Sequence, residues 1–215
     1  MSGVFHPVIR SGLLLGMIAM LGTALLAGVN DLTHERIIEQ EKHRTLQQLH
    51  EIVAVASFNN DLLEDVIEVD DAAFFQHPAP VTVYRARMDG QPVAVVMIVT
   101  APDGYNGDIR LLAGINSFGE ILGVRVVSHR ETPGLGDPIE FEKSSWILGF
   151  TSKSLGNPDG TGWAVKRDGG QFDQFTGATV SPRAVVRAVH RALLYFAANR
   201  QMLFDTPAKT VNPSG

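Results

Sequence analysis

The first hydrophobic stretch of the chain runs from residue 11 to residue 29 and contains no charged side chain. Leu, Ile, Met, Ala and Gly dominate it, and about 18 to 20 apolar residues are what a helix needs to cross the core of a bilayer. A cleaved signal peptide is the alternative, but Leu25 before Ala27 makes a poor small-x-small cleavage site. The pattern therefore favours an uncleaved transmembrane helix within residues 1–30.

Residues 31–57 have the pattern of an amphipathic helix, which Asp31 or Thr33 would cap. Charged and amide side chains occupy one face, and the apolar face consists of Ile38, Leu46, Leu49, Ile52, Val53 and Ala56. We expect this helix to pack on the domain rather than to form a free stalk. The run HPAP at 77–80 ends the region, because a residue before proline is biased away from the helical conformation.

Residues 81–127 contain the short apolar runs and turn residues that are typical of β-structure. Runs at 81–88 and 93–100 flank Asp89-Gly90, a strong hairpin signal, and runs at 109–115 and 121–127 flank a second turn. The run at 93–99 is apolar throughout, so we expect a central strand that is covered on both faces. Because no helix separates these strands, they predict an antiparallel meander rather than a parallel sheet.

The C-terminal third is predicted to be mostly helical or irregular. A short helix is expected at 141–150, a short strand at 163–166 and an amphipathic helix from 182 onward. Ser181 is a suitable N-cap for that helix, with Pro182 at its first position. Small polar residues and prolines after Asn199 predict a frayed tail. The elements together predict an α+β fold with a twisted antiparallel sheet flanked by helices.

Composition narrows the chemistry that the chain can perform. The 215 residues carry a formal net charge of −5, whereas nucleic-acid binding would need a basic face. Cys is absent, which excludes disulfides, thiolate metal sites, Cys-ligated iron–sulfur clusters and thiol catalysis. No pair of the seven His residues has metal-ligand spacing, and no metal site is predicted. Any redox role must therefore use a bound organic cofactor or haem.

The segment DQFTGATVSP at 173–182 has the features of a turn that feeds the start of a helix. Gly177 lets the backbone turn without a Cβ penalty, and Thr179 places a hydroxyl just before the helix. A helix N-terminus presents unpaired N–H groups and the positive end of a dipole, which stabilise a phosphate. On these features alone, an ordinary capped helix is the commoner explanation and a phosphate site is the functional alternative.

A second segment, HRETPGLG at 129–136, follows directly on the last predicted strand. Its residues 132–135 suit a type II turn, with Pro133 at the second position and Gly134 at the third. The turn either merely ends the strand or allows close approach of a flat ring. In the second case, small residues and turn amides would lie against the ring and donate hydrogen bonds to its carbonyl groups.

Both segments resemble motifs of one known family. The run DQFTGAT at 173–179 resembles the D-x-x-[ST]-G-A-[ST] motif of FMN-binding domains that carry flavin as a phosphoester on the last Thr. The run at 129–136 resembles the H-x-E-T-P-G-L-G block of the same domains. With its length and N-terminal hydrophobic segment, the chain resembles, over residues 11–199, the G subunits of the Rnf (Rsx) ion-translocating electron transport complexes.

The resemblance implies an FMN that is covalently attached through its phosphate to Thr179. Thr176 would help to orient the phosphate, and Gly177 and Ala178 would leave room for it. The isoalloxazine ring would be packed or hydrogen-bonded by Thr132, Gly134 and Leu135. A flavin transferase that uses FAD would recognise Asp173, Thr176, Gly177, Ala178 and Thr179. Three roles are open for Glu131, which would orient the turn, accept a hydrogen bond from the flavin or be solvated.

The resemblance also implies a role for the protein in the cell. It would be an electron-carrying subunit of a redox-driven ion translocase in the bacterial inner membrane, with no catalytic residues of its own and with the other complex subunits as partners. The expected parts are a cytoplasmic N-terminus and transmembrane helix, connecting helices, a periplasmic FMN-binding domain and a flexible tail, at 1–30, 31–80, 81–200 and 201–215. Two alternatives are the related C subunit of sodium-pumping NADH:quinone reductase, which is typically longer, and a non-redox assembly module.

Overall fold

A computed structural model describes residues 12–23, 43 and 45–209 of the chain, which divides into two units, Met1–Thr45 and Leu46–Gly215. In the first unit, residues 12–23 are helical and their side chains are exposed. No helix among the described residues is both long enough and apolar enough to cross a membrane. The possible caps Asp31 and Thr33, and most of the helix expected at 31–57, lie outside the described residues.

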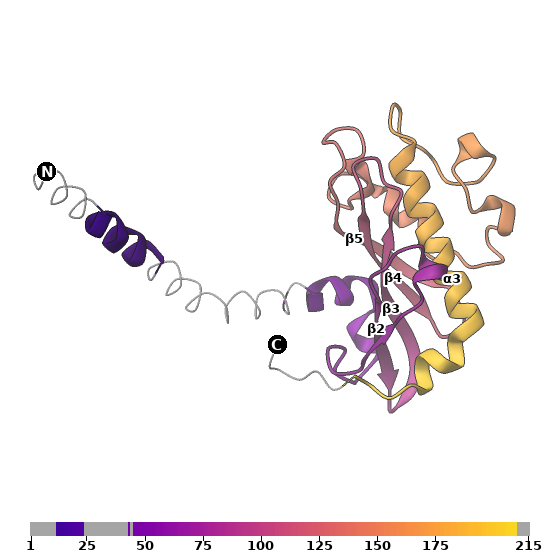
Figure 1. The fold of residues 1–215 in the computed structure, drawn as a ribbon. Coiled ribbons are helices and arrows are strands. Elements are labelled where there is room, and N and C mark those ends of the chain that lie inside the picture. Colours follow the sequence, from indigo (N-terminus) through magenta and orange to yellow (C-terminus); the bar gives the residue numbers. More distant parts are fainter. Residues whose placement is uncertain (1–11, 24–42, 44, 210–215) are drawn as a thin grey trace, which may run out of the picture. The chain divides into compact units, whose positions relative to one another are not determined.

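The second unit contains one antiparallel sheet whose strands lie side by side in chain order (Figure 1). The strands are β1 (Val66–Val69), β2 (Val81–Met88), β3 (Gln91–Ala101), β4 (Ile109–Asn116) and β5 (Ile121–Ser128). Asp89 and Gly90 join β2 to β3 with φ angles of 52° and 79°. Positive φ at both central residues is typical of a type I′ hairpin turn. The predicted α+β class and antiparallel meander are confirmed.

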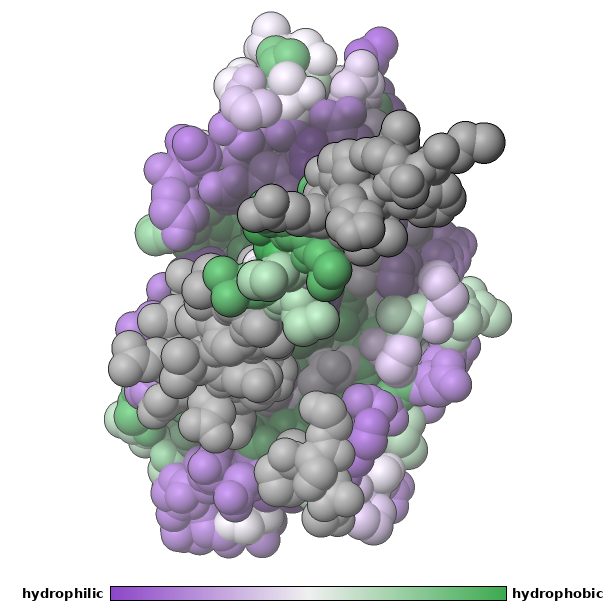
Figure 2. Space-filling view, turned by 60° about the vertical axis from the view of Figure 1, so that its left-hand side comes forward, coloured by the Kyte–Doolittle hydropathy of each residue, from purple (hydrophilic) through white to green (hydrophobic). Residues whose placement is uncertain are grey.

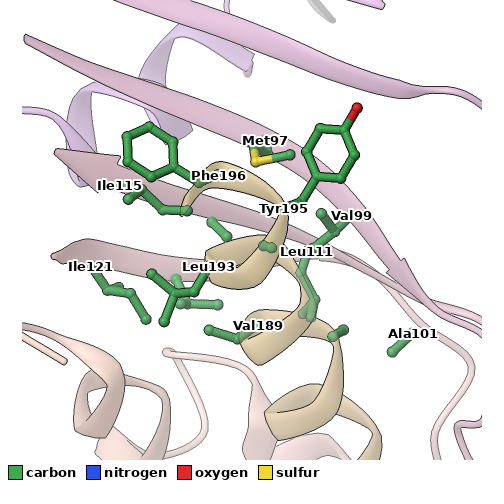
Figure 3. Close-up of a cluster of buried hydrophobic side chains, with 14 of the residues drawn as sticks. Met97, Val99, Ala101, Leu111, Ile115, Ile121, Val189, Leu193, Tyr195 and Phe196 are labelled. Carbon is green, nitrogen blue, oxygen red and sulfur yellow. The ribbon is translucent and has the colours of Figure 1, made fainter. Parts of the chain in front are cut away.

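Helix α3 (Val180–Asp205) covers one face of this sheet and packs on β3 and β4. Figure 3 shows the contact, in which side chains from successive turns of α3 point at the sheet. The helix supplies Val189, Leu193 and Phe196, and the strands supply Met97, Val99, Leu111 and Ile115. These side chains are at most 2% exposed, so removal of apolar surface from water stabilises the contact.

The opposite face of the sheet is covered by the start of the second unit. Residues 46–52 are helical, and Leu49, Ile52 and Val53 pack with Leu62 against that face. Strand β3 contributes Val95 and Met97 to one core and Ala94 and Val96 to the other. The prediction of a central strand that is covered on both faces is therefore confirmed. Figure 2 shows one face of the molecule. Around much of its outline, the residues that are not drawn in grey are hydrophilic.

Several predicted elements differ from the structure. Strand β1 and the one-turn helix α2 (Ala72–Phe75) were not predicted, and the helix expected to run to Ser57 ends at Ile52. The helix expected at 141–150 is the shorter 3₁₀ helix η3 (Ser145–Phe150). Further 3₁₀ turns are η1 (Val55–Ser57), η2 (Asp137–Ile139), η4 (Gly160–Gly162) and η5 (Lys166–Asp168).

Two further differences concern a single bridge and the end of the chain. The strand expected at 163–166 is only an isolated bridge from Val165 to Phe172, because η5 turns the chain away at Lys166. The tail was expected to begin at residue 201, but α3 continues to Asp205. Leu203 and Phe204 are buried in the core, and their burial holds this last turn in place.

The C-terminal end of α3 is bound by a buried guanidinium group. The side chain of Arg85 on β2 is 2% exposed, and its Nη1 donates to the carbonyl oxygens of Leu203 and Phe204 at 3.3 Å. Its Nη2 forms an ion pair with Asp65. Arg87 binds the same carboxylate at 2.7 Å. The last carbonyls of a helix have no partner within the helix, so these arginines satisfy them and complement the negative end of its dipole.

Candidate functional site

The segment 173–179 forms a tight turn immediately before α3, which we call the acceptor turn. The backbone N–H of Ala178 donates to the carbonyl oxygen of Phe175 at 3.1 Å, and Gly177 has a φ angle of 82°. A residue with a side chain is strained at such an angle, which explains the glycine. Thr179 is the last residue of this turn and directly precedes the helix, and its side chain makes no capping hydrogen bond. Its hydroxyl oxygen is therefore not used by the helix backbone.

Residues of the 3₁₀ helices η3 and η5 hold the acceptor turn in place. The indole Nε1 of Trp146 donates to the carbonyl oxygen of Asp173 at 2.8 Å, and Lys166 forms an ion pair with the Asp173 carboxylate at 2.6 Å. The backbone N–H of Arg167 donates to Gln174 Oε1 at 3.2 Å. The ring of Phe175 packs edge-on against Trp146, with 5.3 Å between centroids. The turn is thus fixed at several points by the protein itself.

The segment 129–136 forms the predicted type II turn. The N–H of Leu135 donates to the carbonyl oxygen of Thr132 at 3.1 Å, and Gly134 has a φ angle of 76°. Asp137 accepts a hydrogen bond of 2.6 Å from the N–H of Gly134. His129 accepts from the N–H of Glu131 at 2.9 Å. The conformation of the turn is therefore fixed by its own sequence and by one residue on each side of it.

Glu131 connects the two segments. Its carboxylate is 4% exposed and accepts hydrogen bonds from the hydroxyl of Ser181 in α3 and from the N–H of Asn106 at 3.1 Å. Ser181 is therefore not the predicted N-cap, since α3 begins at Val180 and the serine hydroxyl turns inward to the carboxylate. A buried carboxylate needs such donors because burial without them costs free energy. Of the three possible roles for Glu131, this contact supports orientation of the turn.

Gly136 makes the contact between the two segments possible. A Cβ atom at this position would lie 2.7 Å from Ser181 Oγ and 2.8 Å from Glu131 Oε2. Contacts that short do not occur for real side chains, so any larger residue would push the turn away from α3. The last glycine of the HRETPGLG segment is thus needed for packing, and it places Leu135 beside the start of the helix.

We expect Ser181→Ala to lower the free energy of unfolding by about 1–3 kcal/mol, because it leaves a buried carboxylate with one donor fewer. Urea denaturation followed by circular dichroism would measure the change. Ser145→Ala is the matched control, since Ser145 is exposed and surface substitutions stay within about 0.5 kcal/mol. Equal effects of the two variants would contradict a special role for the contact between Ser181 and Glu131.

A cavity of about 360 Å³ opens where these two segments meet. Small-molecule sites typically measure roughly 300–1,000 Å³. Six of the predicted site residues line the cavity, namely Glu131, Thr132, Leu135, Gly177, Ala178 and Thr179. Gly134, Thr176 and Asp173 are not among its lining residues. The first of these shapes the turn, and the other two lie exposed on the acceptor turn.

The cavity has an apolar rim that sequence reasoning did not identify. Tyr105, Leu135 and Val180 line it and are 69%, 47% and 36% exposed. Tyr105 lies in the loop between β3 and β4, which carries no recognisable motif. Exposed apolar and aromatic side chains beside the Thr179 hydroxyl suit a ligand with a flat ring and a charged end. The residues present therefore fit FMN.

One arginine side chain contacts Thr179, and a second arginine belongs to the first turn of the helix that follows it. Nη1 of Arg167 lies 3.5 Å from the Thr179 hydroxyl oxygen. Arg183, in the first turn of α3, forms a two-pronged ion pair with Asp168 at 2.5 and 2.8 Å. The hydrogen bond from Arg183 lowers the pKa of Asp168. The carboxylate therefore stays ionised and remains bound to Arg183.

Comparison with known proteins agrees with this site. Residues 104–194 match the FMN-binding domain, and residues 1–52 match the RnfG N-terminal region. The G subunit of the ion-translocating oxidoreductase complex from Shewanella loihica is 49% identical, over 94% of this chain and 96% of its own. The corresponding G subunit from Pseudomonas aeruginosa is 50% identical over 92% of both chains. The chain belongs to the family of G subunits of ion-translocating oxidoreductase complexes.

Membership of this G-subunit family confirms the resemblance that the two motifs indicated. The FMN-binding match spans the type II turn, the acceptor turn and the cavity between them. Two residues beside this site, Tyr105 in a loop and Arg167 in η5, were missed because neither belongs to a motif. The one available signal in the sequence was charge, since Arg167 belongs to the charged run KRD at 166–168, shortly before Asp173.

Proposed function

We propose that this protein is the flavoprotein subunit of an ion-translocating electron transport complex and carries electrons on an FMN bound through its phosphate to Thr179. The single observation that carries the proposal is the meeting of the two motif segments in one cavity, with Thr179 at its edge. The FMN-binding match supports the choice of cofactor. Flavin, when bound, supplies one- and two-electron chemistry, and the protein supplies its position and environment.

The residues of the site would have different roles in holding this cofactor. Thr179 offers a hydroxyl that is not used for capping, and Ala178 and Gly177 leave room beside it. Thr132 and Leu135 would contact the ring, while Gly134 and Glu131 hold the turn that presents them. The exposed Asp173 and Thr176 are available for recognition by a flavin transferase that uses FAD. A covalent bond keeps the cofactor at an effective concentration that a dissociable one would not reach.

The proposal also covers the location of the protein in the cell and its partners. The uncharged stretch 11–29 would anchor the protein as a single-pass subunit of the inner membrane, with the FMN-binding domain on the periplasmic side. Partners would be the other subunits of the complex, because the relatives are named as one subunit of a larger oxidoreductase. The protein would act as an electron carrier in this assembly and not as an enzyme on its own.

The test is the mass of the full-length protein purified from cells that also express the flavin transferase. We expect a mass increase of one FMN, and peptide mapping should place it on the peptide that contains Thr179. Covalent flavin on any other peptide would contradict the attachment site. An unmodified protein under these conditions would contradict the covalent carrier and favour a non-redox assembly module.

A further inference from the structure

The cations around the acceptor turn differ in whether a carboxylate neutralises them. Lys166 pairs with Asp173 at 2.6 Å, and Arg187 pairs with Asp103 at 2.8 Å. Arg183 binds both carboxylate oxygens of Asp168. Within the described part of the chain, Arg167 has no ion pair with a carboxylate. Its guanidinium group therefore lies beside Thr179 without a carboxylate in direct contact with it.

The contact of Arg167 with Thr179 leaves this guanidinium able to bind another group. The 3.5 Å between Arg167 Nη1 and Thr179 Oγ1 exceeds the roughly 2.7–2.9 Å of a charge-assisted hydrogen bond. The side chain is exposed, so burial does not hold it in place. The position of the residue is fixed instead by its backbone, through the hydrogen bond from its N–H to Gln174. The backbone of Arg167 is thus held in place, while its guanidinium group can still move relative to the Thr179 hydroxyl oxygen.

We propose that Arg167 takes part directly in covalent flavin attachment, and that its guanidinium binds the phosphoryl group as it is transferred to Thr179. The inference rests on the proposed function. In this transfer a P–O bond forms between Thr179 Oγ1 and the FMN phosphorus of FAD, and the pyrophosphate bond breaks to release AMP. A base on the transferase takes the hydroxyl proton. Arg167 would stabilise the charge on the phosphoryl oxygens and remain paired with the phosphodiester.

The chemistry of the guanidinium suits this task. Its planar set of N–H donors matches phosphate oxygens and stays charged at any physiological pH. The acceptor Thr179 and the cation Arg167 are twelve residues apart in sequence but belong to segments that hydrogen-bond to each other. The chain itself would therefore supply part of the electrostatic stabilisation, and the transferase would supply the base and the nucleotide site.

The test compares the kinetics of flavin attachment to the full-length protein, with purified transferase and FAD, for the wild type, Arg167→Ala, Arg167→Gln and Arg167→Lys. We expect Arg167→Ala and Arg167→Gln to lower kcat about 10- to 100-fold, the value of a lost hydrogen bond to a charged group. The KM for the acceptor protein should change by less than about twofold, since the contact acts during transfer. Lysine should restore part of the rate because it retains the charge.

Arg187→Ala is the matched control, because it removes one positive charge from the first half of α3 without touching Thr179. It should be flavinylated at the wild-type rate. Equal slowing of Arg187→Ala and Arg167→Ala would overturn the inference in favour of a general charge effect. A raised KM with unchanged kcat would overturn it in favour of transferase docking. Wild-type rates for Arg167→Ala would overturn it and leave the proposed function standing, whereas an unmodified wild type would contradict the proposed function itself.

Discussion

Thr179→Ala should abolish covalent flavin attachment and leave the fold intact. The variant lacks the only oxygen at this position that could be esterified. The threonine side chain makes no capping hydrogen bond and one long contact with Arg167, so we expect the free energy of unfolding to change by less than about 0.5 kcal/mol. Intact mass, together with flavin absorbance of the denatured protein, would measure attachment, and thermal unfolding would measure the fold.

Two control variants make this result specific. Thr179→Ser keeps a hydroxyl and should be flavinylated, although its extra side-chain freedom would slow the reaction. Thr161→Ala removes an exposed threonine outside both motif segments and should be flavinylated like the wild type. Retention of covalent flavin by Thr179→Ala would refute the attachment site. Loss of flavin from the Thr161 variant as well would point to a folding or expression effect.

Arg85→Ala should cause a larger loss of stability than Ser181→Ala, about 3–5 kcal/mol. Removal of one partner from a buried ion pair is strongly destabilising, and the Asp65 carboxylate would keep only its ion pair with Arg87. The carbonyl oxygens at the end of α3 lose their donor at the same time. Guanidinium or urea denaturation would measure the change, and hydrogen exchange should locate it in the last turn of α3.

The control for Arg85 is Arg110→Ala, because Arg110 is an exposed arginine on β4 of the same sheet. Its substitution should stay within about 0.5 kcal/mol. A loss below about 1 kcal/mol for Arg85→Ala would show that Arg87, which donates to the carbonyl of Phe204 at 2.6 Å, is sufficient to bind the helix end. The double variant Arg85→Ala and Arg87→Ala would then show the full loss in the free energy of unfolding.

The sheet could be predicted from the sequence because its signals are local. Alternating and continuous apolar runs, with Asp89-Gly90 between two of them, specify β2 to β5 almost to the residue. Strand β1 was missed because it has only four residues and lies among polar ones. The end of α3 was missed because Leu203 and Phe204 are held by contacts with distant parts of the chain.

The site was predicted only where a motif marked it. The two segments were recognised by resemblance, and local rules also gave the type II turn at 132–135. The capping role of Ser181 was wrong because a tertiary contact with Glu131, fifty residues away, competes for its hydroxyl. Local propensity does not include such a partner. Tyr105 and Arg167 reach the site through the fold alone, so no spacing rule could identify them.

The order of elements along the chain sets the order in which the protein can mature. The sheet pairs neighbours in sequence and can form as residues 66–128 emerge from the ribosome, whereas α3 is made after the sheet. The acceptor turn immediately precedes this helix, and the contacts of Arg85 close only when residues 203–206 are available. A transferase that recognises the folded turn would therefore act only after α3 has packed on the sheet. Bound flavin would then serve as a mark of a folded domain, and chains in which α3 has not packed would stay colourless.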